Sequence, residues 1–290
     1  MVKGNKHIIV NIISYIILAF VALCCIVPFM IVISASFSSE PSLIKFGYSI
    51  LPKDFSLDAY KVVFYNSRSL VDAYKITIFT TAVGSVLSIL IISLTAYPLA
   101  RKEYKPRKAV SFYLYFTMLF SGGAIPSYIL ITQYLHLRNN VLVLIIPQLV
   151  NVWNIFVLRT YFASIPSALI EAAKIDGANE FMTFFRIVMP MSVTGIATIL
   201  LLTVLTYWNE WYACLMYMTK EQNITLQYFL QRTMNNIDMS NTSVLNDMSE
   251  VPMESARMAM CVLASGPMIF VFMFFQKYFA QGINVGSVKG

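Results

Sequence analysis

The chain has 290 residues, of which 58% are hydrophobic and 12% charged, and its mean hydropathy is +0.69. This composition excludes an ordinary soluble domain, in which about 25% of residues are charged. The formal charge of +7 does not indicate nucleic-acid binding, because the basic residues lie beside apolar runs rather than in a stripe with interleaved aromatics. Such a distribution is typical of the positive-inside rule for membrane proteins.

Six apolar stretches are long enough to cross a bilayer, which takes about 20 residues in a helix. Continuous apolar runs exclude a transmembrane barrel, whose strands alternate apolar and polar residues. We therefore predict an all-α polytopic membrane protein that forms a single domain over residues 1–290, with six transmembrane helices. The helices are expected at residues 8–33, 74–100, 109–134, 141–161, 191–217 and 253–279.

The basic residues predict how these helices are oriented. Lys3 and Lys6 precede the first apolar run, which is too long for a cleaved signal peptide, so we expect an uncleaved helix with a cytoplasmic N-terminus. Five of the eight residues in 101–108 are basic. A nucleic-acid or anionic-lipid patch is an alternative, but a topology anchor is the favoured interpretation. With six helices, both termini are then cytoplasmic, and residues 34–68 and 218–252 form external loops.

No sequence pattern predicts a metal or nucleotide site in this chain. The cysteines Cys24, Cys25, Cys214 and Cys261 lie in apolar spans without ligand spacing and are interpreted as small hydrophobes. A phosphate-binding GxxxxGK[ST] loop does not occur in the sequence. We therefore expect no enzyme activity, no metal and no bound cofactor.

The segment at residues 162–190 is mixed and charged, although it lies between two apolar spans. Pro166 indicates a helix start, Gly177 indicates a break and Pro190 indicates the end. Two apolar faces are expected on this helix–turn–helix. The first comprises Leu169, Ala172 and Ala173, and the second comprises Phe181, Phe184, Phe185 and Val188.

This segment resembles the EAA loop of bacterial ABC-importer permeases, and we call it the EAA segment. The matching positions are Glu171, Ala172, Ala173, Gly177, Ile187 and Pro190, with Met189 in place of the usual leucine. The resemblance implies a cytoplasmic segment that couples the membrane helices to an ATPase. The coupling residues it implies are Glu171, Ala172, Ala173, Asp176, Gly177, Phe181, Phe184, Phe185 and Pro190.

Three further stretches resemble the sugar-transporting, maltose-type subfamily of these permeases. They are LPKDFSLDAY at 51–60, MLFSGGAIP at 118–126 and the tail at 276–290. The resemblance implies a second permease subunit, two cytoplasmic ATPases that bind ATP and magnesium, and an extracytoplasmic sugar-binding protein. It also implies a bacterial plasma membrane and an oligosaccharide substrate. An ion-coupled secondary transporter, a permease for a non-sugar solute and a homodimer remain alternatives.

A polar aromatic run in the fifth predicted span is the candidate for substrate contact. Sugars combine apolar ring faces with many hydroxyls, which suits aromatic platforms beside Asn or Glu. Aromatic residues of an interfacial belt are an equal alternative. On a continuous helix Tyr207 and Trp211 share one face. The candidate path residues are Tyr207, Trp208, Asn209, Glu210 and Trp211, with Trp153 and Asn154 in the fourth span.

Overall fold

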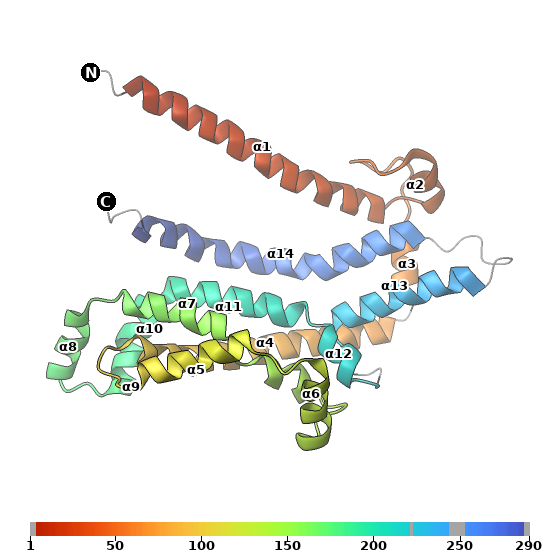
Figure 1. Cartoon of the computed structure of the whole chain (residues 1–290). Helices are drawn as coiled ribbons and strands as arrows, with labels where there is room; N and C mark the ends of the chain where they lie inside the picture. Colours follow the sequence, from red (N-terminus) through yellow and green to blue (C-terminus); the bar gives the residue numbers. More distant parts are fainter. Residues whose placement is uncertain (1–3, 66, 221–222, 244–252, 287–290) are drawn as a thin grey trace. The chain divides into compact units, whose positions relative to one another are not determined.

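The computed structural model describes residues 4–65, 67–220, 223–243 and 253–286, and all regular elements in these ranges are helices (Figure 1). The all-α prediction is confirmed. The α-helices are α1 (Gly4–Ser36), α2 (Glu40–Phe46), α3 (Asp58–Phe64), α4 (Ser67–Ala100), α5 (Arg107–Leu119), α6 (Ala124–Ile129), α7 (Val152–Ala163), α8 (Ser167–Ile175), α9 (Glu180–Thr183), α10 (Met189–Met191), α11 (Val193–Trp208), α12 (Tyr212–Tyr217), α13 (Leu226–Ser243) and α14 (Met253–Gly286). Two short 3-10 helices are η2 (Val141–Leu144) and η3 (Ile146–Gln148), and two short π-helical segments are η1 (Leu130–Tyr134) and η4 (Phe184–Val188).

Among the described residues, three helices are long and apolar enough to cross a membrane, and they lie within α1, α4 and α14. Three bent pairs of helices meet the same criteria together, with bends of 107° between α5 and α6–η1, 49° between η2–η3 and α7, and 83° between α9–α10 and α11. The spans expected at 109–134 and 141–161 each contain one of these bends, and the third bend lies at the start of the span expected at 191–217, in which α11 ends at Trp208. Gly123, with φ of 86°, lies at the first break, because glycine adopts this backbone without steric cost. The number of spans stays a prediction.

The chain divides into two compact units, and the expected single domain over 1–290 stays a prediction. Unit 1 comprises residues 1–67 and 230–267, and unit 2 comprises residues 68–229 and 268–290. Part of the predicted loop at 218–252 is helical, because α13 runs through it. Residues 221–222 and 244–252 of that loop, and 287–290 of the tail, lie outside the described residues.

Within unit 1, the predicted loop at 34–68 is an ordered structure. Phe37 stacks on Phe55 with ring centroids 5.7 Å apart and contacts Tyr60 at 5.0 Å, so two aromatic residues of the sugar-permease element share one partner. Glu40 accepts hydrogen bonds from the backbone N–H groups of Glu254 (2.9 Å) and Ser255 (3.0 Å). These are free donors of the first turn of α14, so Glu40 caps that helix.

Unit 2 has an apolar core that joins three long helices to the EAA segment. Its buried members are Ile92, Ala96 and Leu99 of α4, Ile155, Leu158 and Phe162 of α7, Phe184 and Val188 of η4, and Ile199 of α11. Figure 1 shows α8, α9 and α10 at one end of this unit and α6 and α12 at the other. The core thus fixes the EAA segment at one end of the unit.

Candidate functional site

The first helix of the EAA segment, α8, presents one face to the protein and one to its surroundings. Ile170 and Ala173 are buried at 4% and 7% exposure. Leu169 and Ala172 are exposed, so the expected apolar face of Leu169, Ala172 and Ala173 is buried only at Ala173. The buried face follows the i, i+3 spacing of Ile170 and Ala173 instead. Glu171 lies on the exposed side.

The turn after α8 has the geometry that the sequence predicts. Gly177 has a φ of 80°, a value at which a side chain would be strained. Its N–H donates to the carbonyl of Lys174 (3.1 Å), and the N–H of Ala178 donates to the carbonyl of Ala173 (2.9 Å). These two bonds form a Schellman motif, which satisfies the last carbonyls of a helix. Asp176 lies exposed at the C-cap position.

The second half of the EAA segment begins at a cap that sequence reasoning missed. The side chain of Asn179 accepts a hydrogen bond from the backbone N–H of Met182 (2.7 Å) and starts α9. Asparagine is a preferred N-cap residue, so its position two residues after the glycine break was the available signal. The chain then continues through η4 and α10, in which Pro190 lies. The helical run ends at Met191, one residue after this proline, where the chain bends by 83° into α11.

The expected second apolar face of the EAA segment divides into two. Phe184 and Val188 are 2% and 1% exposed, whereas Phe181 and Phe185 are 71% and 49% exposed. Phe181 lies in α9 and the other three lie in the π-helical segment η4, and only the flank formed by Phe184 and Val188 turns into the core. Phe184, one of the coupling residues that the resemblance implies, is therefore packed inside the chain and is not exposed for direct contact with an ATPase.

A polar link ties the EAA segment to α4, and sequence reasoning missed it. The hydroxyl of Tyr97 donates to Oε2 of Glu180 (2.6 Å), and Nζ of Lys174 lies 2.9 Å from Oε1 of the same carboxylate. The Tyr97 ring also contacts Phe184 at 5.3 Å between centroids. A hydrogen bond to a charged group is stronger than a neutral one. Glu180 thus joins both halves of the EAA segment to the end of α4.

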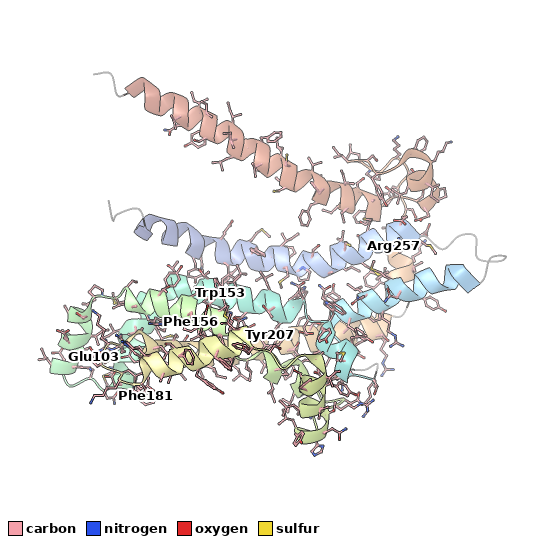
Figure 2. All side chains as sticks on the ribbon, viewed as in Figure 1. Glu103, Trp153, Phe156, Phe181, Tyr207 and Arg257 are labelled. Carbon is pink, nitrogen blue, oxygen red and sulfur yellow. The ribbon has the colours of Figure 1, made fainter. Side chains whose placement is uncertain are left out.

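A cavity of about 420 Å³ lies beside this link. Its lining residues are Leu94, Tyr97, Pro98, Arg101, Glu103, Tyr104, Lys174, Glu180, Phe181 and Phe184. Figure 2 places Phe181 and Glu103 at the end of unit 2 that carries the EAA segment. This end presents exposed apolar side chains beside the carboxylate of Glu171, and we call it the EAA surface. Its members are Leu169, Glu171, Ala172, Ile175, Phe181 and Phe185.

The aromatic run at 207–212 is not one helical face, because α11 ends at Trp208 and α12 begins at Tyr212. Tyr207 is 1% exposed, and its hydroxyl donates to the carbonyl of Ile145 (3.0 Å) and lies 3.2 Å from Oγ of Ser88. A Cβ on Gly84 would lie 2.5 Å from the Tyr207 ring. Tyr207 therefore packs between α4 and η2–η3, which corrects its assignment to a substrate path.

The other residues of the run have separate roles. Glu210 accepts a hydrogen bond from Nε2 of Gln148 and another from the backbone N–H of Ala213 (2.6 Å), so both of its carboxylate oxygens have donors within the chain. Trp208 is 4% exposed. Asn209 is exposed, accepts from Nε2 of Gln227 (3.3 Å) and donates to the carbonyl of Leu205 (2.9 Å). Trp211 is 39% exposed.

The two candidate path residues in the fourth predicted span differ in their exposure. Trp153 is 60% exposed on α7, whereas Asn154 is 6% exposed. The structure therefore does not assemble the seven path candidates into one site. Trp153, Asn209 and Trp211 keep exposed surface, and Tyr207, Trp208 and Asn154 do not. In the ranges that the structure covers, no three His, Cys, Asp or Glu side chains gather as metal ligands would.

Comparison with known proteins identifies the family. Residues 5–285 match the family described as the inner membrane component of binding-protein-dependent transport systems. The chain belongs to this family. It is therefore a multi-pass membrane permease component, and the alternative of an ion-coupled secondary transporter is not supported.

Individual relatives cover nearly the whole chain. The polygalacturonan/rhamnogalacturonan transport system permease protein YtcP of Bacillus subtilis is 36% identical over 98% of this chain and 100% of its own length. The arabinooligosaccharides transport system permease protein AraQ of Halalkalibacterium halodurans is 28% identical and covers 94% of each chain. A crystal structure of a bacterial ABC transporter that imports the acidic polysaccharide alginate has a chain with a TM-score of 0.79 and 30% identity, covering 96% of this chain and 99% of that one.

Proposed function

We propose that this permease forms, with a second permease, the path of an ATP-driven importer for oligosaccharides or polysaccharide fragments. The substrate class rests on the relatives, which are named for plant polysaccharides, arabinooligosaccharides and alginate. An extracytoplasmic binding protein delivers the sugar, and two cytoplasmic ATPases bind ATP and magnesium. Both termini of this chain lie in the cytoplasm.

The EAA surface is the proposed docking site for an ATPase. Its apolar side chains are exposed although they lie on an ordered segment, and Phe181 is 71% and Ile175 86% exposed. Burying such a side chain against a partner contributes about 1.5–3 kcal/mol. Glu171 supplies a carboxylate for a basic residue of the ATPase. Because Phe184 and Glu180 attach this surface to α4, a displacement of the ATPase is passed to the membrane helices, as alternating access requires.

Replacing Gly177 with aspartate is expected to detach the ATPase without unfolding the chain. No atom lies within 4 Å of the added Cβ, so the change strains the turn and adds a charge beside the EAA surface. The measurement is mass spectrometry of proteins that co-purify with the tagged chain from native membranes. We expect an ATPase and a second permease with the unaltered chain, and loss of the ATPase with Gly177→Asp and with Glu171→Lys.

Gly47→Asp is the matched control, because Gly47 has a φ of 72° with no atom within 4 Å of an added Cβ and lies outside the EAA segment. It is expected to keep the ATPase. Full ATPase recovery with both EAA variants would refute the coupling role. Uptake of labelled uronic-acid oligosaccharides, compared with neutral oligosaccharides and amino acids, tests the substrate class. Uptake of a non-sugar solute alone would refute it.

Replacing Tyr97 with phenylalanine is expected to lower the amount of substrate transported per ATP hydrolysed. The change removes the hydroxyl that binds Glu180 and keeps the ring against Phe184. Because the carboxylate is partly exposed, the loss is about 1 kcal/mol, or roughly fivefold in the population of the linked state. Tyr104→Phe, which alters a tyrosine of the same cavity, is the control. An unchanged ratio in Tyr97→Phe together with normal assembly would show that this hydrogen bond does not carry coupling.

A further inference from the structure

A second cavity, of about 460 Å³, lies between α5 and α7 in unit 2. The two helices pack against each other, and the beginning of α5 faces the middle of α7. Figure 2 labels Phe156, the aromatic residue that α7 contributes. The cavity is lined by Arg107, Lys108, Ser111, Phe112, Tyr115, Phe156 and Arg159. It is separate from the cavity beside the EAA segment, with which it shares no lining residue.

The charge of this cavity is positive and uncompensated. Arg107, Lys108 and Arg159 line it, and none of the lining residues is acidic. In the part of the chain that the structure describes, the ion pairs of Lys and Arg involve other residues. Arg107 and Arg159 are half-buried and Lys108 is exposed, and three like charges around one cavity repel one another. An anion in the cavity would relieve this repulsion.

A hydrogen-bond donor in the same cavity lacks a partner. The Oγ of Ser111 is buried and makes no hydrogen bond to any residue that the structure describes. A buried hydroxyl without a partner is unfavourable, so native proteins rarely leave one. Ser111 follows Arg107 by one helical turn on α5, which places both on the same side of the helix. An oxygen of an anion between the arginines would satisfy this hydroxyl.

The apolar wall of the cavity continues along α5 as a row of exposed aromatic rings. Phe112, Phe116 and Phe120 repeat at i, i+4 and i+8, and their side chains are 70%, 47% and 64% exposed. Ring centroids lie 6.5 Å apart for Phe112 and Phe116 and 4.4 Å apart for Phe116 and Phe120. A free phosphate ion has no apolar part that could pack against these rings. The acyl chain of a phospholipid can lie along them while its phosphate occupies the cavity.

We propose that the α5–α7 cavity binds the phosphate of an anionic phospholipid, whose acyl chain lies along Phe112, Phe116 and Phe120. Arg107 and Arg159 provide forked donors that match phosphate oxygens, and Ser111 provides the third contact. Basic pockets between membrane helices are suited to anionic headgroups. A topology anchor needs only the basic residues of the 101–108 loop. It requires neither an arginine on α7 nor an unpartnered hydroxyl between the two helices.

The test uses the full chain, purified in detergent with the subunits that accompany it, and native mass spectrometry to count retained lipids. Phosphatidylglycerol is expected to be retained in preference to phosphatidylcholine. Arg107→Gln and Arg159→Gln are each expected to reduce its retention by about tenfold. Arg159→Lys keeps the positive charge but removes the paired donors of the guanidinium, so it should reduce phosphatidylglycerol retention less than Arg159→Gln does. This graded effect distinguishes loss of lipid binding from misfolding of the chain. Lys105→Gln removes a charge of the same loop outside the cavity and should change retention by less than about twofold.

The remaining arms distinguish lipid from free anion. Phe116→Ala is expected to weaken phosphatidylglycerol retention, because it shortens the acyl surface without touching the cations. Inorganic phosphate at the lipid's concentration is expected not to displace it. Equal retention of the two lipids, equal losses in Lys105→Gln and Arg159→Gln, or full displacement by phosphate would each overturn the proposal.

Discussion

Replacing Phe184 with alanine is expected to lower the free energy of unfolding by about 3–5 kcal/mol, as removal of a large buried aromatic side chain does. Phe184 is 2% exposed and contacts Phe162 of α7 at 6.3 Å and Tyr97 of α4 at 5.3 Å between ring centroids. Its neighbour Phe185 is 49% exposed. Phe185→Ala is therefore expected to alter stability far less and to weaken the contact with the ATPase.

The two phenylalanines thus form a matched pair with opposite expected outcomes. Thermal unfolding of the purified chain reports the first effect, and the ratio of co-purified ATPase to permease reports the second. Phe184→Ala should lower the melting temperature and the yield of chain. Phe185→Ala should keep both and lower the ratio. If Phe185→Ala destabilised the chain while Phe184→Ala left it intact, the assignment of inner and outer faces would be wrong.

The parts of this site that sequence predicted depend on local patterns. Gly177 was identified as a break because few residues other than glycine adopt positive φ, and its φ is 80°. The apolar stretches predicted an all-α membrane protein because a helix needs about 20 apolar residues to cross a bilayer, and these stretches have that length. Both inferences need only a short window of sequence, and both are confirmed.

The parts that sequence missed depend on contacts between distant residues or on small shifts in helix direction. Tyr97 and Glu180 are 83 positions apart, and nothing in either neighbourhood indicates the other. Helical periodicity grouped Phe184 and Phe185 on one apolar face, but it does not show that burial divides this face between them. The continuous helix assumed through 207–212 stops at Trp208, because Glu210 instead caps the next helix through Ala213.

The expected external loop at 218–252 contains a helix that its polar composition does not indicate. Its many Asn, Ser and Thr residues are weak helix formers, yet Leu226–Ser243 is a helix. At its start, the N–H of Leu226 donates to Oγ1 of Thr77 (2.8 Å), and Leu226 itself is fully buried. Tertiary packing of this kind overrides weak helix propensity.

Replacing Tyr207 with alanine is expected to disrupt the fold, whereas replacing Trp211 is expected to alter transport. Tyr207→Ala removes a ring that fills the space over Gly84 and a hydroxyl that binds the carbonyl of Ile145. The expected cost is about 3–5 kcal/mol. Tyr207→Phe keeps the ring but leaves the carbonyl without this donor, and it should cost about 1–3 kcal/mol.

Trp211 is 39% exposed and contacts Tyr212 edge-on at 6.0 Å, so its removal leaves a smaller cavity and exposes less of the core. Transport in membrane vesicles, divided by the amount of assembled complex, separates the two effects. Tyr207→Ala should reduce transport and assembly in parallel, because it acts through folding. Trp211→Ala should reduce transport per assembled complex, because an exposed aromatic ring can contact a sugar.

A parallel loss of transport and assembly in Trp211→Ala would instead make Trp211 a packing residue like Tyr207. It would remove the run at 207–212 from the translocation path, because its remaining exposed members are Asn209, which is hydrogen-bonded to Gln227, and Tyr212.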